Sequence, residues 1–319
     1  MKKINKFILA GLFFALAASS FAASKKSIVC TTFPQYDWIT NILGNKAGSF
    51  ELTLLLNNGT DLHSYQPSVK DIAKISTCDL FVYVGGESDE WVENVLENAK
   101  NKNMLVVNMM EALGDNVYEE ELIEGMQGEE EEEEDGEEED PEYDEHIWLS
   151  LKNAATLTQL LCQNIQKLDS KNAGEYKKNT EAYISKLNAL DTQYSKAVAS
   201  AKYDTLLYAD RFPFRYLVED YGLKYYAAFI GCSAESEASF ETIKFLADKL
   251  NLLELPAVLT LEKSNKKIAR TVIEASGKKE TKILEMDSIQ SVTQKEIKAG
   301  KNYFNTMEKN LETLKVALN

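Results

Sequence analysis

Apolar residues in the first part of the chain follow two alternating patterns. Short, continuous apolar runs are typical of buried strands, and the segments between them carry apolar residues at helical spacing. Because strands that alternate with short helices favour a parallel sheet covered by helices, we predict an α/β lobe here. The predicted strands are 27–33, 50–58, 80–86 and 104–111, and the predicted helices are 33–44, 69–79 and 88–101.

The last part of the chain repeats the same rhythm, which predicts a second α/β lobe. The fold class is therefore α/β, with two lobes of mainly parallel sheets flanked by helices. The predicted strands are 204–209, 225–230, 256–262 and 282–289, and the predicted helices are 211–222, 232–251, 264–277 and 299–319.

Between the two lobes, residues 152–202 carry apolar side chains at helical spacing throughout. Ser170 and Asn172 offer a break and a cap, so we expect two helices rather than one. The second, near 172–202, would be about 46 Å long at a rise of 1.5 Å per residue, and it is taken as the linker 171–202. We therefore expect one long, rigid helix to join an N-terminal lobe, 24–170, to a C-terminal lobe, 203–319.

The first residues have the layout of a secretory signal peptide, with basic residues, an apolar run and then small residues. We expect residues 1–23 to be removed and the mature chain to be exported to the periplasm. The first cysteine, Cys30, lies beyond the cleavage region, so a lipobox and a lipid anchor are not expected. No later apolar stretch reaches the roughly 20 residues that a membrane helix needs.

Charge is concentrated in one segment. Fourteen acidic residues lie between positions 129 and 145 and account for most of the net charge of −16, so the rest of the chain is nearly neutral. Such a run repels itself, and we predict an acidic, disordered loop over 118–145 that either attracts cations or is merely solvated. Without a Lys/Arg cluster, nucleic acid is not an expected partner.

The four cysteines are far apart, form no CxxC pair and lie among apolar neighbours. We expect buried free thiols, with a single disulfide as the alternative in an oxidising compartment. The cysteines are Cys30, Cys78, Cys162 and Cys232.

The chain has only two histidines, and each lies in a turn-like segment among acidic and aromatic residues. His63 is in DLHSYQPS at the exit of a predicted strand, and His146 is in DEHIWLSL after the acidic run. Taken singly, each could be an ordinary surface or core histidine. Taken together with carboxylates, two neutral imidazoles would hold a divalent transition-metal ion. Acidic residues also follow the predicted strands of the second lobe, at Asp210, Glu235, Glu237, Glu262 and Asp287.

These segments resemble the metal-binding solute-binding proteins of ABC importers for zinc and manganese, over nearly the whole mature chain. DLHSYQPSVKDI is similar to the family segment DPHxYEPTPxD, and DEHIWLSL is similar to DPHxWLDP. LFVYVGGESDEWVENVL, YLVEDYGL, SAESEASFETI, VLTLEKS and ILEMDSI follow the order of the family's later segments.

The resemblance implies two α/β lobes joined by one long helix, with the metal ion between them. It implies His63 and His146 as ligands from the first lobe and Asp287 as a carboxylate ligand from the second. The family's third ligand precedes the segment ending YGL, where this chain has no histidine. Counting back from Tyr221 without a gap, the position of the family's third ligand falls on Arg211, which cannot bind a metal ion. A shift of one residue places it at Asp210. We take Asp210 as the third ligand, with Glu237 or a water molecule as its substitute.

Two imidazoles with two carboxylates are a harder set than three imidazoles, which favours Mn²⁺ or a four-coordinate Zn²⁺ with oxygen ligands. A charged loop before the second histidine, however, is typical of the family's zinc-specific members. We therefore expect Zn²⁺, with Mn²⁺ as the alternative, and an affinity that falls as pH drops through the histidine range near about 6.5.

The expected function is capture of this divalent metal ion as a monomer and its delivery to the membrane permease of an ABC importer, without catalysis. A zinc-dependent hydrolase would add a general base and an open coordination position, but HExxH, GxSxG and GxxxxGK[ST] motifs are absent. A surface adhesin, a role sometimes attributed to members of the family, is the remaining alternative.

Overall fold

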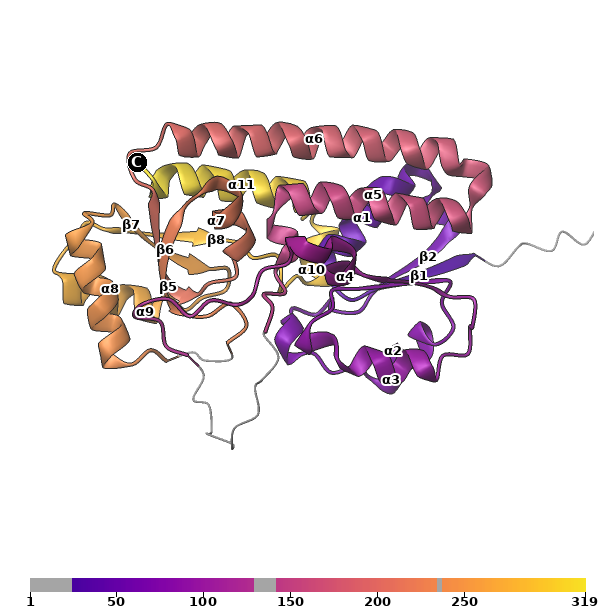
Figure 1. Ribbon diagram of the computed structural model, residues 1–319, viewed down its shortest axis with the longest axis horizontal. Helices are drawn as coiled ribbons and strands as arrows, with labels where there is room; N and C mark the ends of the chain where they lie inside the picture. The colour runs from indigo at the N-terminus through magenta and orange to yellow at the C-terminus, as the bar shows by residue number, and fades with distance from the viewer. Residues whose placement is uncertain (1–24, 129–141, 234–236) are drawn as a thin grey trace, which may run out of the picture.

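The computed structural model describes residues 25–128, 142–233 and 237–319. Within this part of the chain, two lobes lie side by side beneath one long helix (Figure 1). Each lobe is built on a four-stranded parallel sheet. The predicted signal peptide, 1–23, lies outside the described residues. No described helix is long and apolar enough to cross a membrane.

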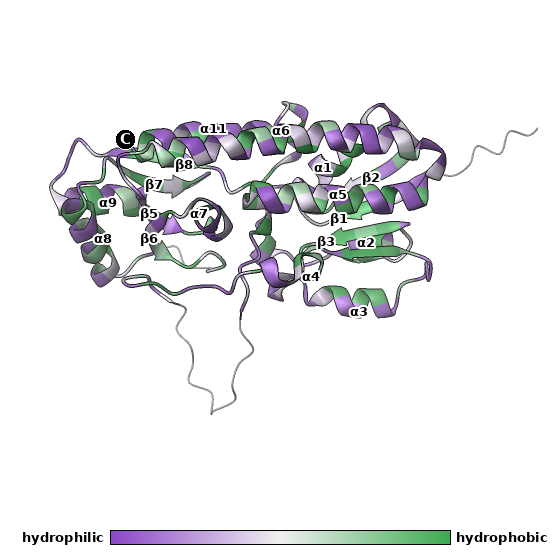
Figure 2. Ribbon diagram, turned by 45° about the horizontal axis from the view of Figure 1, so that its top comes forward, coloured by the Kyte–Doolittle hydropathy of each residue, from purple (hydrophilic) through white to green (hydrophobic). Residues whose placement is uncertain are grey.

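The sheet of the N-terminal lobe has the strand order β2-β1-β3-β4, and all its pairs are parallel. β3 consists of hydrophobic residues, as the green arrow in Figure 2 shows, because a sheet covered by helices buries both faces. The Ser68 side chain caps the helix that precedes β3, and Gln35 Oε1 accepts the Thr32 N–H at 3.1 Å at the start of the helix that follows β1. The strands are β1 Lys26–Cys30, β2 Phe50–Leu54, β3 Leu80–Tyr83 and β4 Leu105–Asn108, and the helices are α1 Phe33–Leu43, α2 Val69–Ile75, α3 Trp91–Glu97, α4 Met109–Leu113 and α5 Leu151–Leu168.

The sheet of the C-terminal lobe has the order β6-β5-β7-β8 and is also parallel. Its β5–β6 register shifts between Tyr208 and Arg211, so the end of β5 is irregular where it approaches the first lobe. The strands are β5 Thr205–Arg211, β6 Lys224–Phe229, β7 Ala257–Leu261 and β8 Lys282–Met286, and the helices are α7 Arg215–Tyr221, α8 Phe240–Leu252, α9 Lys267–Ser276, α10 Gln294–Lys298 and α11 Tyr303–Ala317.

The long helix α6, Ala173–Ala199, has 27 residues and is therefore about 40 Å long. It runs along the top of both lobes in Figure 1 and contacts both. At one end Asn179 donates to the Ile42 carbonyl of α1 at 3.0 Å, and at the other Tyr194 donates to the Met307 carbonyl of α11 at 2.6 Å. A short 3-10 helix, Ser170–Asn172, separates it from α5. The predicted fold class is confirmed, including the single long helix that joins the lobes.

A second connection between the lobes is made by the core. Tyr303, at the start of α11, donates to the Trp148 carbonyl at 2.6 Å and packs edge-on against Trp38 at 5.2 Å between ring centroids. Trp148 in turn donates from its indole to the Ser288 carbonyl at 2.8 Å. These buried contacts make one continuous hydrophobic core that includes residues of both lobes. The arrangement favours a stiff molecule over one with a freely moving hinge.

The structure describes both ends of the range 118–145, which the sequence predicts as an acidic, disordered loop, and both ends are paired. Glu120 N–H donates to the Glu142 carbonyl, and Gln127 N–H donates to the Ala228 carbonyl of β6, each at 2.9 Å. Residues 129–141 lie outside the described residues. The described part of this segment thus passes from the first lobe to β6 of the second, where Gln127 pairs with Phe229 (Figure 1).

Candidate metal centre

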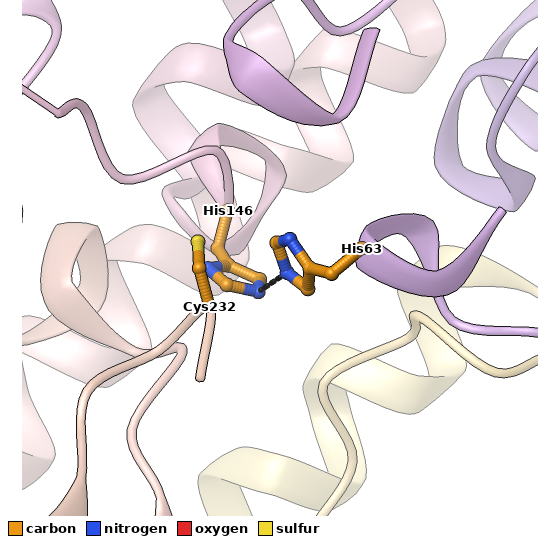
Figure 3. Close-up of side chains that lie close together, drawn as sticks. All are labelled: His63, His146 and Cys232. Atoms are coloured by element: carbon orange, nitrogen blue, oxygen red, sulfur yellow. Dashed lines mark hydrogen bonds between the residues drawn. The ribbon is translucent and has the colours of Figure 1, made fainter. Parts of the chain in front are cut away.

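The fold brings the chain's two histidines together. His63 lies in a short 3-10 helix, Leu62–Ser64, that follows β2, and His146 immediately precedes another, Ile147–Leu149. Their Nε2 atoms are 3.2 Å apart, and Figure 3 shows the two rings directed at one point. The predicted juxtaposition of the two motifs is therefore present in the structure.

His146 is completely buried, and its ring orientation is set by Asp144. Asp144 Oδ1 accepts the backbone N–H of His146 at 2.7 Å and lies 2.9 Å from its Nδ1. Gly231 packs against the same ring, and a Cβ at Gly231 would approach His146 Cε1 to 3.2 Å. With Nδ1 occupied by the carboxylate, Nε2 is the nitrogen that faces the site.

The other ring nitrogen of His63 is held in a comparable way. Its Nδ1 lies 2.9 Å from Ser88 Oγ and 3.3 Å from Glu145 Oε2. Glu145 is itself fixed, because its Oε1 accepts the Ser88 N–H at 2.7 Å. Gly86, at φ 80°, allows this approach, since a Cβ there would lie 2.5 Å from Glu145 Oε1. Nε2 of His63 is thus also left for the site.

The spacing of the two Nε2 atoms suits a single metal ion. With Zn–N bonds of about 2.0–2.1 Å, two nitrogens at adjacent corners of a tetrahedron lie about 3.3 Å apart. The observed 3.2 Å is close to this value. Metal-ligating histidines usually bind a carboxylate, carbonyl or water through their second nitrogen. His146 does so with Asp144, whereas Nδ1 of His63 lies 2.9 Å from the Ser88 hydroxyl, with the Glu145 carboxylate at 3.3 Å.

Cys232 is the third side chain of the cluster. Its Sγ, His63 and His146 offer ligand atoms that all lie within 4.8 Å of one another, and among the described residues they form the only such group of three (Figure 3). Cys232 follows β6 on the loop that begins with Gly231. Its apolar neighbours in the sequence predict a core thiol, but a loop at the carboxyl end of a parallel strand is where ligands bind.

The remaining cysteines agree with the sequence prediction of buried free thiols, because Cys30, Cys78 and Cys162 are buried and none of the four forms a disulfide. Cys232 is partly exposed and lines a cavity. Burial and the nearby Asp144 carboxylate raise the pKa of its thiol well above the ordinary value.

The charges around the histidines are mostly negative. Burial alone would lower the pKa of His146, but attraction to Asp144 outweighs it and raises this pKa above its ordinary value. Burial opposes ionisation of Asp61, yet His63 and Arg211 hold the pKa of that carboxyl below its usual range. A cation would therefore enter surroundings that already favour positive charge.

Two cavities adjoin the cluster. One, of about 480 Å³, is lined by His63, Cys232, Glu120 and Glu145, with Glu87, Glu90 and Glu142 farther along it. The other, of about 420 Å³, is lined by Asp61, Asp210 and Arg211. The first gives an ion from solvent a path to both the imidazole of His63 and the thiol.

The predicted carboxylate ligands do not belong to this three-residue group in the described part of the chain. Asp210 accepts backbone N–H groups from Arg211 at 3.0 Å and Leu261 at 3.3 Å. Asp287 forms an ion pair with Lys301 at 2.6 Å and accepts the Ile289 N–H at 2.9 Å.

Glu237 and Arg211, which were also considered at the third ligand position, both lie in described parts of the chain. Glu237 is exposed and forms an ion pair with Lys267 at 3.3 Å, whereas Glu235 lies outside the described residues. Arg211, the residue reached by the ungapped count, donates to Asp61 at 2.8 Å and to the Ser233 carbonyl at 3.1 Å. Its guanidinium thus lies beside the site and links the two lobes.

Comparison with known proteins identifies the family of this chain. The model of the family "Zinc-uptake complex component A periplasmic" matches residues 28–317, which is nearly all of the described chain. The protein belongs to this family. Members of the zinc-uptake component A family are extracytoplasmic solute-binding proteins, and the family resemblance stated from the sequence is confirmed.

Two relatives, a zinc-binding protein and a zinc-uptake protein, align with nearly the whole length of the chain. It is 32% identical over 99% of its length to the zinc-binding lipoprotein AdcA of Streptococcus pneumoniae and 29% identical over 98% to the zinc-uptake protein ZnuA of Bacillus subtilis. It spans 61% of that AdcA, 56% of the AdcA proteins of Streptococcus pyogenes and 96% of that ZnuA.

Solved structures show the same fold. The Zn(II)-bound ZnuA-like domain of Streptococcus pneumoniae AdcA has a TM-score of 0.71 at 28% identity, covering 92% of this chain and 99% of that one. The metal-dependent lipoprotein YcdH of Bacillus subtilis has a TM-score of 0.75 at 25% identity, covering 92% of this chain and 100% of that one. The half-length match to AdcA thus corresponds to its ZnuA-like domain.

Proposed function

We propose that this protein captures Zn²⁺ outside the cytoplasm and delivers it to the membrane permease of an ABC importer. The observation that carries the proposal is the convergence of two Nε2 atoms at 3.2 Å, each on an imidazole whose Nδ1 is held by acceptors. This arrangement orients both rings before the ion arrives, which lowers the cost of assembling the site. The zinc named for the AdcA and ZnuA relatives supports the same ion.

In the proposed site His63 and His146 are ligands and act as neutral imidazoles. The resemblance adds Asp287 and Asp210 as carboxylate ligands from the second lobe, with Glu237 as the substitute for Asp210. Asp287 would have to leave Lys301 to reach the ion, because its Oδ2 is now 2.6 Å from Nζ. The protein supplies binding, orientation and shielding, and the ion leaves chemically unchanged.

The acidic lining of the larger cavity supports capture from dilute solution. Glu87, Glu90, Glu120, Glu142 and Glu145 lie along the path to His63. Among the described residues that line this cavity, Arg211 is the one cation, and a cleft lined mainly by charges of one sign raises the local concentration of counter-ions and the rate at which they associate. We propose that the protein works as a monomer and that Mn²⁺, the alternative ion, binds more weakly.

Calorimetric titration of the metal-stripped mature protein with Zn²⁺ and with Mn²⁺ tests the proposal. We expect one tight zinc site, and in His63→Ala and His146→Ala a loss of affinity beyond the roughly 10- to 100-fold typical of groups that only orient a ligand. Asn98→Ala, which removes an exposed polar side chain at the end of α3, is the control and should bind as the wild type does. Weak binding that both histidine variants retain would contradict the proposal.

Delivery needs a separate experiment. Cells that lack their own copy of this protein would be supplied with the wild type or with the double variant His63→Ala/His146→Ala, and uptake of radiolabelled zinc would be measured. We expect the wild type to restore uptake and the double variant to fail. Equal uptake with both would show that the histidine site does not serve import.

A further inference from the structure

We infer that Cys232 is a third protein ligand of the ion held by His63 and His146, so that the site is a mixed imidazole–thiolate site. This inference rests on the proposed function and specifies which cations the same site takes. Its basis is the grouping of Sγ with the two imidazoles within 4.8 Å (Figure 3).

The distances require only a small adjustment. With a Zn–S bond of about 2.3 Å and Zn–N bonds of about 2.0–2.1 Å, a tetrahedral site places sulfur about 3.6 Å from each nitrogen. The present group lies within 4.8 Å. Rotation of the short Cys232 side chain, on a partly exposed loop residue, can bring Sγ closer to the two Nε2 atoms.

The backbone that carries the thiol is already fixed beside the imidazole. Gly231 has no room for a side chain, because a Cβ would lie 3.0 Å from the Phe212 carbonyl and 3.2 Å from His146 Cε1. The next residue, Cys232, donates its N–H to Glu120 Oε1 at 3.1 Å. The chain therefore holds Cβ of Cys232 next to the site, and the side-chain torsion alone decides the direction of Sγ.

A second observation points to a ligand at the same place. Oε2 of Glu120, the other oxygen of the carboxylate that fixes Cys232, is buried and meets no donor in full hydrogen-bond geometry, while the Cys232 thiol interacts with the same carboxylate. Buried carboxylate oxygens are normally paired, and an unpaired one needs an explanation such as an ion. A cation bound to the neighbouring thiolate would supply the missing positive charge.

Binding is balanced by the loss of one proton. The S–H bond of Cys232 breaks, its electron pair forms the bond to the divalent ion, and the proton passes to solvent base through the adjoining cavity. The neutral imidazoles lose none. At a pH well above the histidine range, where both imidazoles are already neutral, calorimetry in buffers of different ionisation enthalpy should therefore show about one proton released per ion from the thiol.

A thiolate changes which ions the site selects. Thiolate is a soft ligand that favours ions such as Zn²⁺ and Cd²⁺, whereas Mn²⁺ prefers carboxylate and water oxygens. The two-imidazole, two-carboxylate set expected from the sequence would leave zinc and manganese closer in affinity. Replacing one carboxylate with a thiolate accounts for a preference for zinc in a chain that lacks a third histidine.

The test uses Co²⁺ as a spectroscopic substitute for zinc. In the metal-stripped protein we expect Co²⁺ to produce an intense sulfur-to-metal charge-transfer band in the near ultraviolet. The band should be absent in Cys232→Ser and in Cys232→Ala, and present in Cys162→Ala, which removes a buried thiol of α5. Zinc affinity should fall about 10-fold or more in the Cys232 variants, and the preference for Zn²⁺ over Mn²⁺ should narrow.

The outcomes separate this inference from the proposed function. If wild-type protein binds Co²⁺ and Zn²⁺ tightly through the histidines but shows no charge-transfer band, and Cys232→Ala binds equally well, the thiol is not a ligand and the proposed function stands. If wild type has no tight zinc site at all, both fail. Circular dichroism and the thermal midpoint of each variant show whether a loss reflects unfolding.

Discussion

Arg211 of the C-terminal lobe donates from Nη2 to Oδ2 of Asp61 in the N-terminal lobe at 2.8 Å. Asp61 Oδ1 also accepts a hydrogen bond from the backbone N–H of His63 at 3.2 Å. The pair therefore connects the two lobes directly beside a proposed ligand. Both side chains are only partly exposed, so solvent screens their attraction less than that of a surface pair.

This cross-lobe pair should contribute measurably to stability. Arg211→Met leaves Asp61 with an uncompensated charge, and we expect it to lower the free energy of unfolding by about 1–3 kcal/mol. A cycle with Asp61→Asn and the double variant, followed by urea unfolding, should give a coupling of about 0.5–3 kcal/mol. Arg270→Met, at an exposed position on α9, is the control. Additive effects in the cycle would show that the pair is energetically unimportant.

Asp144 should be needed for zinc affinity without touching the ion. Asp144→Asn keeps the size of the side chain but removes the charge that orients and polarises His146, and we expect about a 10- to 100-fold loss in affinity. Zinc titration of this variant and of the wild type measures the loss in affinity. Asp204→Asn, whose carboxylate pairs with Lys224 at the surface, should leave affinity unchanged. An unaltered affinity in Asp144→Asn would mean that the ring is oriented by packing alone.

Zinc affinity should fall on acidification, beginning above the ordinary histidine range. The pKa of His146 is raised, mainly because attraction to Asp144 exceeds the opposing effect of burial. A raised pKa means that protons compete with the ion at a higher pH than usual, so affinity is full well above this pKa and is lost as pH falls through it. Competition titrations between about pH 5 and 8 measure this. A flat profile would show that no imidazole binds the ion.

Asp287 and Lys301 give a test of the second-lobe carboxylate. If Asp287 is a ligand, Lys301→Met frees it and raises zinc affinity, and Asp287→Ala lowers affinity by about 10-fold or more. Asp210→Ala tests the other predicted carboxylate in the same titration. If Lys301→Met and Asp287→Ala change only the unfolding midpoint, the pair is structural and Asp287 is not a ligand.

Asp37 should make stability depend on pH far from the metal site. Burial raises its pKa to about 6, although the Tyr303 N–H and the Asn41 side chain bind its carboxylate. The stability from the raised pKa is fully present below 3.8, the ordinary pKa of an aspartate in the unfolded chain, and is lost as pH rises through about 6. The difference between these two values corresponds to about 3 kcal/mol.

The variant Asp37→Asn removes this titration. Its free energy of unfolding should therefore rise relative to wild type between about pH 4 and pH 7, as measured by urea unfolding at several pH values. Asp248→Asn, on the exposed face of α8, is the matched control. A constant difference between Asp37→Asn and wild type across that range would show that Asp37 does not titrate differently in the fold.

The amino-acid sequence by itself determined the architecture. Short, mainly apolar runs at β3 and β7 are typical of buried strands, and Tyr176, Tyr183 and Leu187, at helical spacing, lie on the buried face of α6. These are local, periodic signals, which a chain carries without reference to its tertiary contacts. The two histidine motifs were also identifiable, because imidazoles flanked by acids in turns are unusual in a chain with so few histidines.

Only the tertiary structure decided which side chains share the site. Cys232 follows an ordinary buried strand and looked like a core thiol, but the loop after β6 places it beside His146, which lies 86 positions earlier in the sequence. Arg211 and Asp61 are paired across 150 positions, and Asp287 faces Lys301. The direction of a side chain at the end of a strand depends on the backbone conformation of the loop and on contacts with the other lobe. Neither of these produces a periodic pattern in the sequence.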